Sequence, residues 1–253
     1  MEARSVSNVK VALVWAVLGA VATAAVFPYV IALLPEAFAK VPMPIPVVIA
    51  LQLVQATALV FLLSWVGLIC GNSLSLDSPL MRAWLSDGAV TIKRRRLLIV
   101  ILVGSIIALA LLAMDSVFQR YMPASFSALP KIAFWKRIAA APYGGIVEEC
   151  LCRLFLVSVI AWMIARVFAR RRTQVPPWVF WIAIVAASLL FGIGHLPAAA
   201  QLWPLTTTVI LRTILLNSIA GVSFGWFFWR WGLEYAVIAH FSCDVVLHGL
   251  GSA

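Results

Sequence analysis

Long apolar runs constrain this chain more than any other feature of its sequence. A transmembrane helix needs about 20 mostly apolar residues to cross a hydrocarbon core of about 30 Å. Backbone groups in lipid must be hydrogen-bonded within the protein, so only helices and closed barrels span it. The runs are continuous and lack the alternation of barrel strands. We therefore predict an all-α, polytopic transmembrane helical bundle of about seven spans, at roughly 11–34, 47–70, 97–114, 138–165, 178–196, 205–229 and 233–250.

The sixth run carries Asn217 and Gly221 and is a candidate for division there, which would give eight spans. The first run is too long for the 7–15-residue apolar region of a cleaved signal peptide, so we interpret it as a retained signal anchor. No internal repeat or second domain is visible. We expect one membrane domain over 1–253, with N-terminal spans and connectors in 1–137 and the core spans in 138–253.

Composition excludes an ordinary soluble fold. Hydrophobic residues make up 64% of the chain and charged residues 11%, whereas soluble domains are about 45–50% apolar and about 25% charged. The net charge of +10 falls mostly between the apolar runs. It therefore indicates orientation by cytoplasmic Lys and Arg, not binding to nucleic acid. We expect a multi-pass integral membrane protein in contact with the lipid bilayer, in the plasma (inner) membrane if the host is bacterial.

Basic residues at alternate connections predict that the N-terminus is cytoplasmic. The positions assigned to the cytoplasmic side are Arg4, Lys10, Lys93, Arg94, Arg95, Arg96, Arg166, Arg170, Arg171, Arg172 and Arg230.

Ionisable residues inside spans are costly and are functional candidates by default. This chain places them in three of the later runs: Glu148, Glu149, Arg153, His195, Glu234, His240, Asp244 and His248. Packing is the alternative explanation for each one, because an intramembrane histidine often only hydrogen-bonds a neighbouring helix. So many polar residues in three runs are harder to explain as packing. His248 lies close to the C-terminus, where an interfacial position is favoured over a catalytic one.

Spacing along each helix predicts which of these residues pair with one another. Glu149 and Arg153 stand at i and i+4, with Glu first, which is the favourable order for an ion pair. Glu148 lies about 100° further round an α-helix and is left without that partner, so it is the candidate general base. His240 and Asp244 are also at i and i+4, where the carboxylate could hold the imidazole in one orientation.

Three motifs in the C-terminal part of the chain resemble those of a known family. They are E-E-x-x-x-R at 148–153, F-x-x-x-H at 191–195 and H-x-x-x-D at 240–244. All three lie in order on separate apolar runs. The chain is similar to the CPBP family of CAAX-prenyl-protease and bacteriocin-processing intramembrane endopeptidases, also called the ABI family, over about residues 144–249.

This resemblance implies a glutamate-dependent intramembrane protease without a cofactor. Glu148 would activate the attacking water with help from His195, while Glu149, Arg153 and Phe191 would support the site. His240 and Asp244 would stabilise the oxyanion. The implied partner is a membrane-bound peptide or protein substrate, cleaved near its C-terminal region. Peptide hydrolysis requires these components: a base for water and donors at the developing oxyanion.

The sequence departs from the family at Asp244, where the family has Asn or another small polar residue. Asn can donate a hydrogen bond to an oxyanion, but an ionised Asp cannot. We therefore expect Asp244 to orient His240 or to keep it charged, with His240 as the donor. Alternatively, Asp244 is protonated and donates the hydrogen bond itself.

Other mechanisms remain open at the sequence level. Glu148, His195, His240 and Asp244 are of zinc-ligand types, although H-E-x-x-H is absent. A cysteine protease is a second alternative, because Cys152 is four residues from Glu148 and two more cysteines, Cys150 and Cys243, lie inside the motifs. Buried free cysteine is more commonly a small hydrophobic residue.

A non-catalytic membrane immunity factor, scaffold protein or transporter is the alternative from another functional class. A transporter should show repeats or paired broken helices, and only the chain break between Pro197 and Pro204 suggests one.

Overall fold

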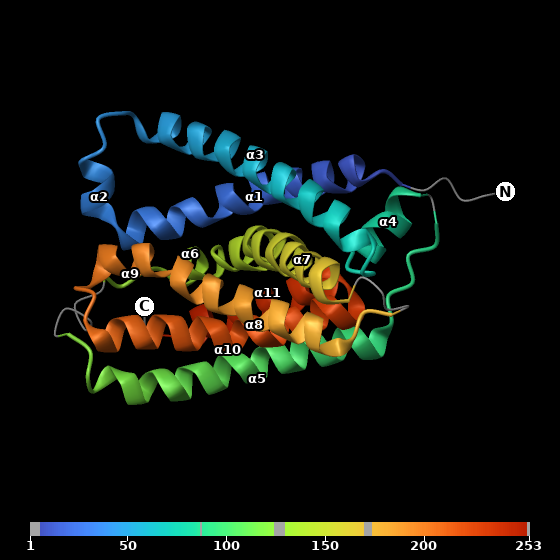
Figure 1. Cartoon of the computed structure of the whole chain (residues 1–253). Helices are drawn as coiled ribbons and strands as arrows, with labels where there is room; N and C mark the ends of the chain where they lie inside the picture. Colours follow the sequence, from blue (N-terminus) through green and yellow to red (C-terminus); the bar gives the residue numbers. More distant parts are fainter. Residues whose placement is uncertain (1–5, 87, 124–129, 170–173, 252–253) are drawn as a thin grey trace.

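The computed structural model describes residues 6–86, 88–123, 130–169 and 174–251, and these residues form helices and no strand. Arg4 and Arg170 to Arg172, used above for orientation, lie outside the described residues. The elements (Figure 1) are α1 (Asn8–Leu33), α2 (Pro35–Ala39), α3 (Ile45–Asn72), α4 (Pro79–Leu85), α5 (Arg94–Gln119), α6 (Phe134–Ile138), the π-helices η2 (Tyr143–Glu148) and η3 (Cys150–Val157), α7 (Ser158–Phe168), α8 (Pro177–Gly194), α9 (Leu196–Leu202), α10 (Thr207–Trp231) and α11 (Leu233–Leu250).

Six helical stretches among the described residues are long and apolar enough to cross a membrane, so the predicted polytopic helical bundle is confirmed. They are 8–33, 45–72, 94–119, 134–168, 177–202 and 207–231. The seventh predicted run forms α11, which has 18 residues and a composition made less apolar by its ionisable side chains. The suggested division of the sixth run is wrong. The Asn217 amide donates to the Thr213 carbonyl within an unbroken α10.

Prolines mark several helix boundaries. Pro35, Pro79 and Pro177 stand at the first position of α2, α4 and α8, where the missing N–H costs no hydrogen bond. The predicted break near Pro197 and Pro204 is also present, because α8 ends at Gly194 and the short α9, which contains Pro197, ends at Leu202 before Pro204.

The π-helical segment lies at the centre of the bundle (Figure 1). The α1–α3 hairpin covers one side of η2 and η3, while α11 packs on η2 and α8 on η3. Two further pairs, α5 with α11 and α8 with α10, close the opposite side. The fourth apolar run, which carries two acids and an arginine, is therefore contacted by helices on several sides.

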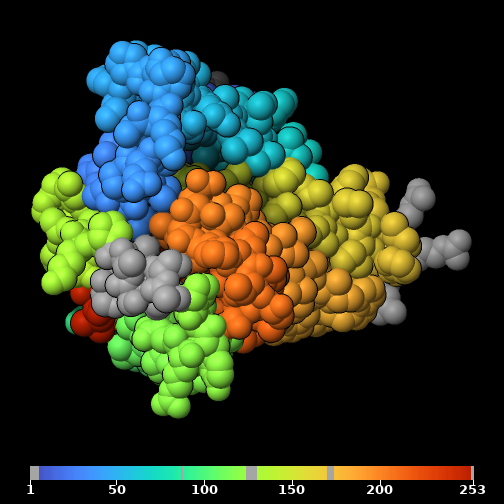
Figure 2. Space-filling model, turned by 90° about the vertical axis from the view of Figure 1, so that its left-hand side faces the viewer, coloured from blue at the N-terminus to red at the C-terminus, as the bar shows by residue number. Residues whose placement is uncertain are grey.

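The starts of α1 and α5 and the ends of α7 and α10 lie at one end of the bundle, together with α4 (Figure 1). The Arg82 guanidinium of α4 donates to the Val6 carbonyl and to Asn8 Oδ1, which fixes the start of α1 there. Figure 2 views the opposite end, where orange α9 lies between the blue α1–α3 hairpin and the green end of α5.

Glu234, a buried acid of the seventh run, has a structural role at the end that carries α4. Ser78 Oγ donates to Glu234 Oε1 at 2.7 Å, and the Met81 N–H donates to the same oxygen at 2.7 Å. Trp15 Nε1 in turn donates to Ser78 Oγ at 3.0 Å. The carboxylate therefore links α1, α4 and α11. It is not part of the three motifs.

Small residues allow helices to approach closely, as is common inside membranes. At Gly104 of α5, an added Cβ would lie only 2.2 Å from the Ala239 carbonyl oxygen of α11. Nothing lies within 4 Å of a Cβ added at Gly194, the last residue of α8. The first glycine is therefore required for packing and the second is not.

We predict that Gly104→Ala lowers the midpoint of thermal unfolding in detergent, because α5 and α11 must separate at an overpacking cost of about 1–3 kcal/mol. Gly194→Ala makes the same chemical change in open space and is the matched control. Thermal unfolding followed by size-exclusion chromatography measures both. Equal midpoints for the two variants would show that the close approach of α5 to α11 is not needed for stability.

Candidate active site

The first motif lies in π-helical backbone, with hydrogen bonds from i to i+5 instead of the α-helical spacing assumed from the sequence. Such segments are rare and frequently occur at functional sites. Gly144 explains part of the local geometry: an added Cβ would lie 2.1 Å from Asp244 Oδ2 and 3.1 Å from His240 Nε2. The glycine therefore allows the side chains of α11 to lie directly against η2.

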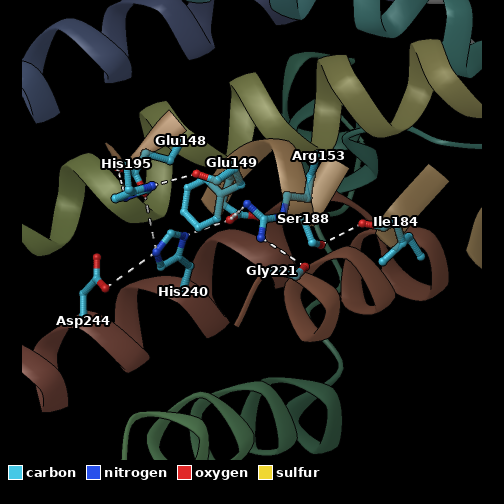
Figure 3. A network of polar contacts seen from close by, with 10 residues as sticks. Glu148, Glu149, Arg153, Ile184, Ser188, His195, Gly221, His240 and Asp244 are labelled. Carbon is cyan, nitrogen blue, oxygen red and sulfur yellow. Dashed lines mark hydrogen bonds and ion pairs between the residues drawn. The ribbon is translucent and has the colours of Figure 1, made fainter. Parts of the chain in front are cut away.

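The structure brings Glu148, His195, His240 and Asp244 together from η2, the end of α8 and α11 (Figure 3). Glu148 Oε1 lies 3.8 Å from His195 Nε2, and Glu148 Oε2 lies 3.8 Å from His240 Nε2. Asp244 Oδ1 lies 3.6 Å from the same His240 nitrogen. One carboxylate thus faces two imidazoles, which come from helices far apart in the sequence.

Beside this group is a buried ion pair. Arg153 Nη1 lies 2.9 Å from Glu149 Oε1, and the side chains of both residues are almost fully buried. Arg153 Nη2 also donates to the Gly221 carbonyl of α10 at 3.1 Å. The i to i+4 pair expected from the sequence is present despite the π-helical backbone.

Glu149 has a second partner that the sequence did not predict. His240 Nδ1 lies 2.8 Å from Glu149 Oε1. A carboxylate only accepts hydrogen bonds, so Nδ1 donates and the other ring nitrogen faces Glu148. The Glu149 carboxylate, which accepts this hydrogen bond, fixes the imidazole, while the expected role of Asp244, whose Oδ1 lies 3.6 Å from Nε2, stays a prediction. Spacing along one helix could not show this contact between η2 and α11.

His195 is oriented in a similar way. Its Nδ1 donates to the Phe191 carbonyl, one helical turn earlier, at 2.8 Å. His195 Nε2 is thereby directed at Glu148. Side-chain exposure is 31% for His195 and 21% for Glu148, so both are accessible from outside the protein. The second motif therefore supplies an imidazole on the more open side of the carboxylate.

Two phenylalanines surround the imidazoles and the arginine. The Phe191 ring centroid lies 4.5 Å from that of His195 and 5.0 Å from the Arg153 guanidinium carbon. Phe224 of α10 stacks on His240 at 4.5 Å and lies 5.4 Å from the same guanidinium carbon. Phe191 was predicted as a supporting residue. Phe224 was missed, because no motif or charge distinguishes it from other apolar residues of its run.

A cavity of about 840 Å³ reaches the other side of this group. His240, Asp244 and Phe191 line its inner part, whereas Glu148 and His195 are not among its lining residues. His248 also lines the cavity, where its ring meets that of Tyr29 edge to face. The cavity thus reaches the site from the His240 side, while Glu148 and His195 are partly exposed outside it.

The geometry also bears on the alternative mechanisms. Within the four described stretches of the chain, no three His, Cys, Asp or Glu side chains are grouped so that they could hold a metal ion. The four predicted site residues therefore contact one another in pairs without forming a recognisable ligand set. Cys150, Cys152 and Cys243 are buried free cysteines, as expected of small apolar residues in a packed core.

Comparison with known proteins gives one match. A family model described as "Type II CAAX prenyl endopeptidase Rce1-like" matches residues 130–246. No curated protein and no solved structure matches the chain. The matched region contains all three motifs and the elements that bring their side chains together, so it agrees with the resemblance identified from the motifs.

We predict that Arg153→Met destabilises the protein strongly, because it leaves the Glu149 carboxylate buried without its cation. Breaking one partner of a buried pair costs about 3–5 kcal/mol. The double variant Glu149→Gln with Arg153→Met should recover much of this loss, since no buried charge remains. Unfolding in detergent measures both, with Arg166→Met at the end of α7 as the control. A double variant less stable than Arg153→Met alone would contradict this role.

Proposed function

Because a family model of Rce1-like type II CAAX prenyl endopeptidases matches residues 130–246, we propose that the chain is an endopeptidase of this kind and cleaves membrane-associated substrates with a water molecule activated by Glu148. The protein is a multi-pass integral membrane protein. The proposed substrates are proteins or peptides cut near their C-terminal region. The proposed location in a bacterial host is the plasma membrane.

The placement of Glu148 supports this proposal more than any other observation. Each of its oxygens lies 3.8 Å from a histidine Nε2, and its side chain is partly exposed. Its ion contacts among the described residues are with these two histidines, while Arg153 pairs with the neighbouring Glu149. Glu148 is therefore the acid of the pair that can accept a proton from water.

In the proposed reaction, the Glu148 carboxylate removes a proton from water while the water oxygen attacks the scissile carbonyl carbon. His195 Nε2, on the open side of Glu148, positions this water. His240 Nε2 faces the opposite carboxylate oxygen and supports the negative charge that develops on the carbonyl oxygen. The carbon–nitrogen bond then breaks, and the proton held by Glu148 passes to the leaving amine.

Asp244 has a narrower proposed role. It lies 3.6 Å from His240 Nε2, so a negative charge on Asp244 attracts an N–H presented by this nitrogen. Glu149 holds the other ring nitrogen. The two acids would together keep His240 as a donor toward the oxyanion, which removes the need for an Asn at 244.

The test is cleavage by purified full-length protein of an S-farnesylated peptide ending in Cys-Val-Ile-Leu, followed by mass spectrometry. We expect Glu148→Gln to lower kcat/KM by at least about 10³-fold, because water loses its base. Cys152→Ala and added chelator should leave the rate unchanged. A folded Glu148→Gln variant with wild-type cleavage would rule out the proposed base, and loss of cleavage with chelator or in Cys152→Ala would favour the corresponding alternative.

A second prediction concerns the position at which the sequence departs from its family. Asp244→Asn should retain kcat/KM within about tenfold of wild type, because an amide can donate to the oxyanion directly. Asp244→Leu, of similar size, should lose more activity than Asp244→Asn but less than the about 10²–10³-fold that follows removal of an oxyanion donor itself, because His240 remains. The same peptide assay measures both. Equal losses in the two variants would show that polarity at this position is not used.

A further inference from the structure

Two glutamine side chains of α3 face outward from the bundle, on a helix long and apolar enough to span the membrane. Gln52 and Gln55 are both exposed, and neither amide is hydrogen-bonded to another of the described residues. The nearby Thr57 differs, because its hydroxyl donates to the Leu53 carbonyl of the same helix at 2.6 Å. Lipid offers an amide no water, and glutamine in membrane helices hydrogen-bonds across to another helix. These two amides therefore need an explanation that the single bundle does not supply.

Gln55 lies inside the hydrocarbon core and not at its boundary. The helix α3 has 28 residues and is about 42 Å long, whereas the core is about 30 Å thick. Gln55 follows the first residue, Ile45, by ten positions, which is about 15 Å along the axis. Whichever end of α3 projects from the core, this depth is within it. Gln52 is about 10 Å from the start of the helix and can lie nearer the boundary.

The side of α3 that carries Gln55 is not covered by the rest of the bundle. Only 11% of the most apolar stretch of α3 is buried, while the other five candidate spans have 22% to 44%. The opposite side packs on α1, η3 and α7, and there the fully buried Val60 meets Gly19 of α1. Gln55 stands about 140° round the helix from Val60. Figure 1 accordingly shows α3 at the outer edge of the bundle.

The exposed residues around Gln55 have the spacing of a helix–helix contact. Leu51, Gln55, Ala58 and Leu62 follow one another at steps of four, three and four residues, and all four are exposed. We call these four residues the α3 seam. The steps are those of the a and d positions of a coiled coil, in which a single polar residue fixes the register and the number of helices. Ala58 is small and allows a second backbone to come close.

The chemistry of Gln55 points to a second copy of this chain as the partner. An amide has two N–H donors and an acceptor oxygen, so two glutamines can satisfy each other reciprocally. Copies inserted in the same orientation are related by a two-fold axis along the membrane normal, which brings the same surface of each copy together. The helix α3 then meets its counterpart in parallel, with Gln55 opposite the partner's Gln55.

We propose that the protein forms a two-fold dimer in the membrane through the α3 seam, held in register by the paired Gln55 amides. In this pair each N–H donates to the carbonyl oxygen of the other amide, and the apolar seam residues pack on either side. The seam contains no residue of the candidate active site. The dimer is therefore independent of the proposed hydrolysis and goes beyond it.

The oligomeric state of the full-length protein in liposomes tests this, by fluorescence energy transfer between labelled copies over a series of protein-to-lipid ratios. We expect Gln55→Leu to raise the dimer dissociation constant about 5- to 30-fold, as for lost hydrogen bonds between membrane helices. Gln55→Asn keeps an amide and should lose less. Gln201→Leu makes the same change on the exposed side of α9 and should dimerise like wild type.

Three results of this experiment would overturn the proposal. The first is a wild-type protein that stays monomeric at every ratio, which would leave the α3 seam to lipid or to a different protein. The second is an equal loss in Gln55→Leu and Gln201→Leu, and the third is an equal loss in Gln55→Leu and Gln55→Asn. Cleavage activity does not enter any of these outcomes, so they are distinct from a failure of the proposed reaction.

Disulfide cross-linking locates the contact on α3. The background carries Cys70→Ala, because Cys70 is half-buried while the other three free cysteines are buried. Ala58→Cys should form a disulfide between copies on oxidation in membranes, and Leu59→Cys, about 100° further round the helix, should not. Adding Gln55→Leu should lower the yield at position 58. Equal yields at 58 and 59, or a yield at 58 unchanged by Gln55→Leu, would contradict the paired amides.

Discussion

The buried charge of Arg153 is the constraint on which the arrangement of this protein depends. A guanidinium at this depth must be neutralised and hydrogen-bonded inside the bundle, and it finds Glu149 on its own helix and the Gly221 carbonyl on α10. Glu149 in turn accepts from His240 on α11. One ion pair therefore joins three helices and fixes the imidazole, while Glu148 stays outside this pair and is the base of the proposed reaction.

Much of the fold follows from hydrophobicity alone. Apolar runs and prolines predicted the helices to within a few residues, because lipid leaves a chain few other options. The π-helical backbone of η2 and η3 could not be predicted, because apolar runs do not distinguish it from an α-helix, and neither could the close approach of α11 to Gly144. The seventh run was found in spite of its polar residues, and its Glu234 proved to join α11 to α1 and α4.

The candidate site was predictable as a set of residues, and less so as a set of contacts. Because ionisable side chains are costly inside a membrane, acids and histidines within the apolar runs could be identified as candidates from the sequence. The spacing of i to i+4 also predicted the Glu149–Arg153 pair. The hydrogen bond from His240 to Glu149, the stacking of Phe224 and the cavity beyond His240 all join separate helices. Periodicity within one helix carries no information about such contacts, so they required the assembled bundle.

In the proposed reaction, water activated by Glu148 attacks the substrate directly. The most direct measurement is peptide cleavage in the presence of hydroxylamine, with the N-terminal product analysed by mass spectrometry. Direct attack by water gives only the carboxylic acid, whatever the hydroxylamine concentration, and both acid and cleavage disappear in Glu148→Gln. A hydroxamate product that increases with hydroxylamine would reveal an acyl-enzyme intermediate and contradict the account.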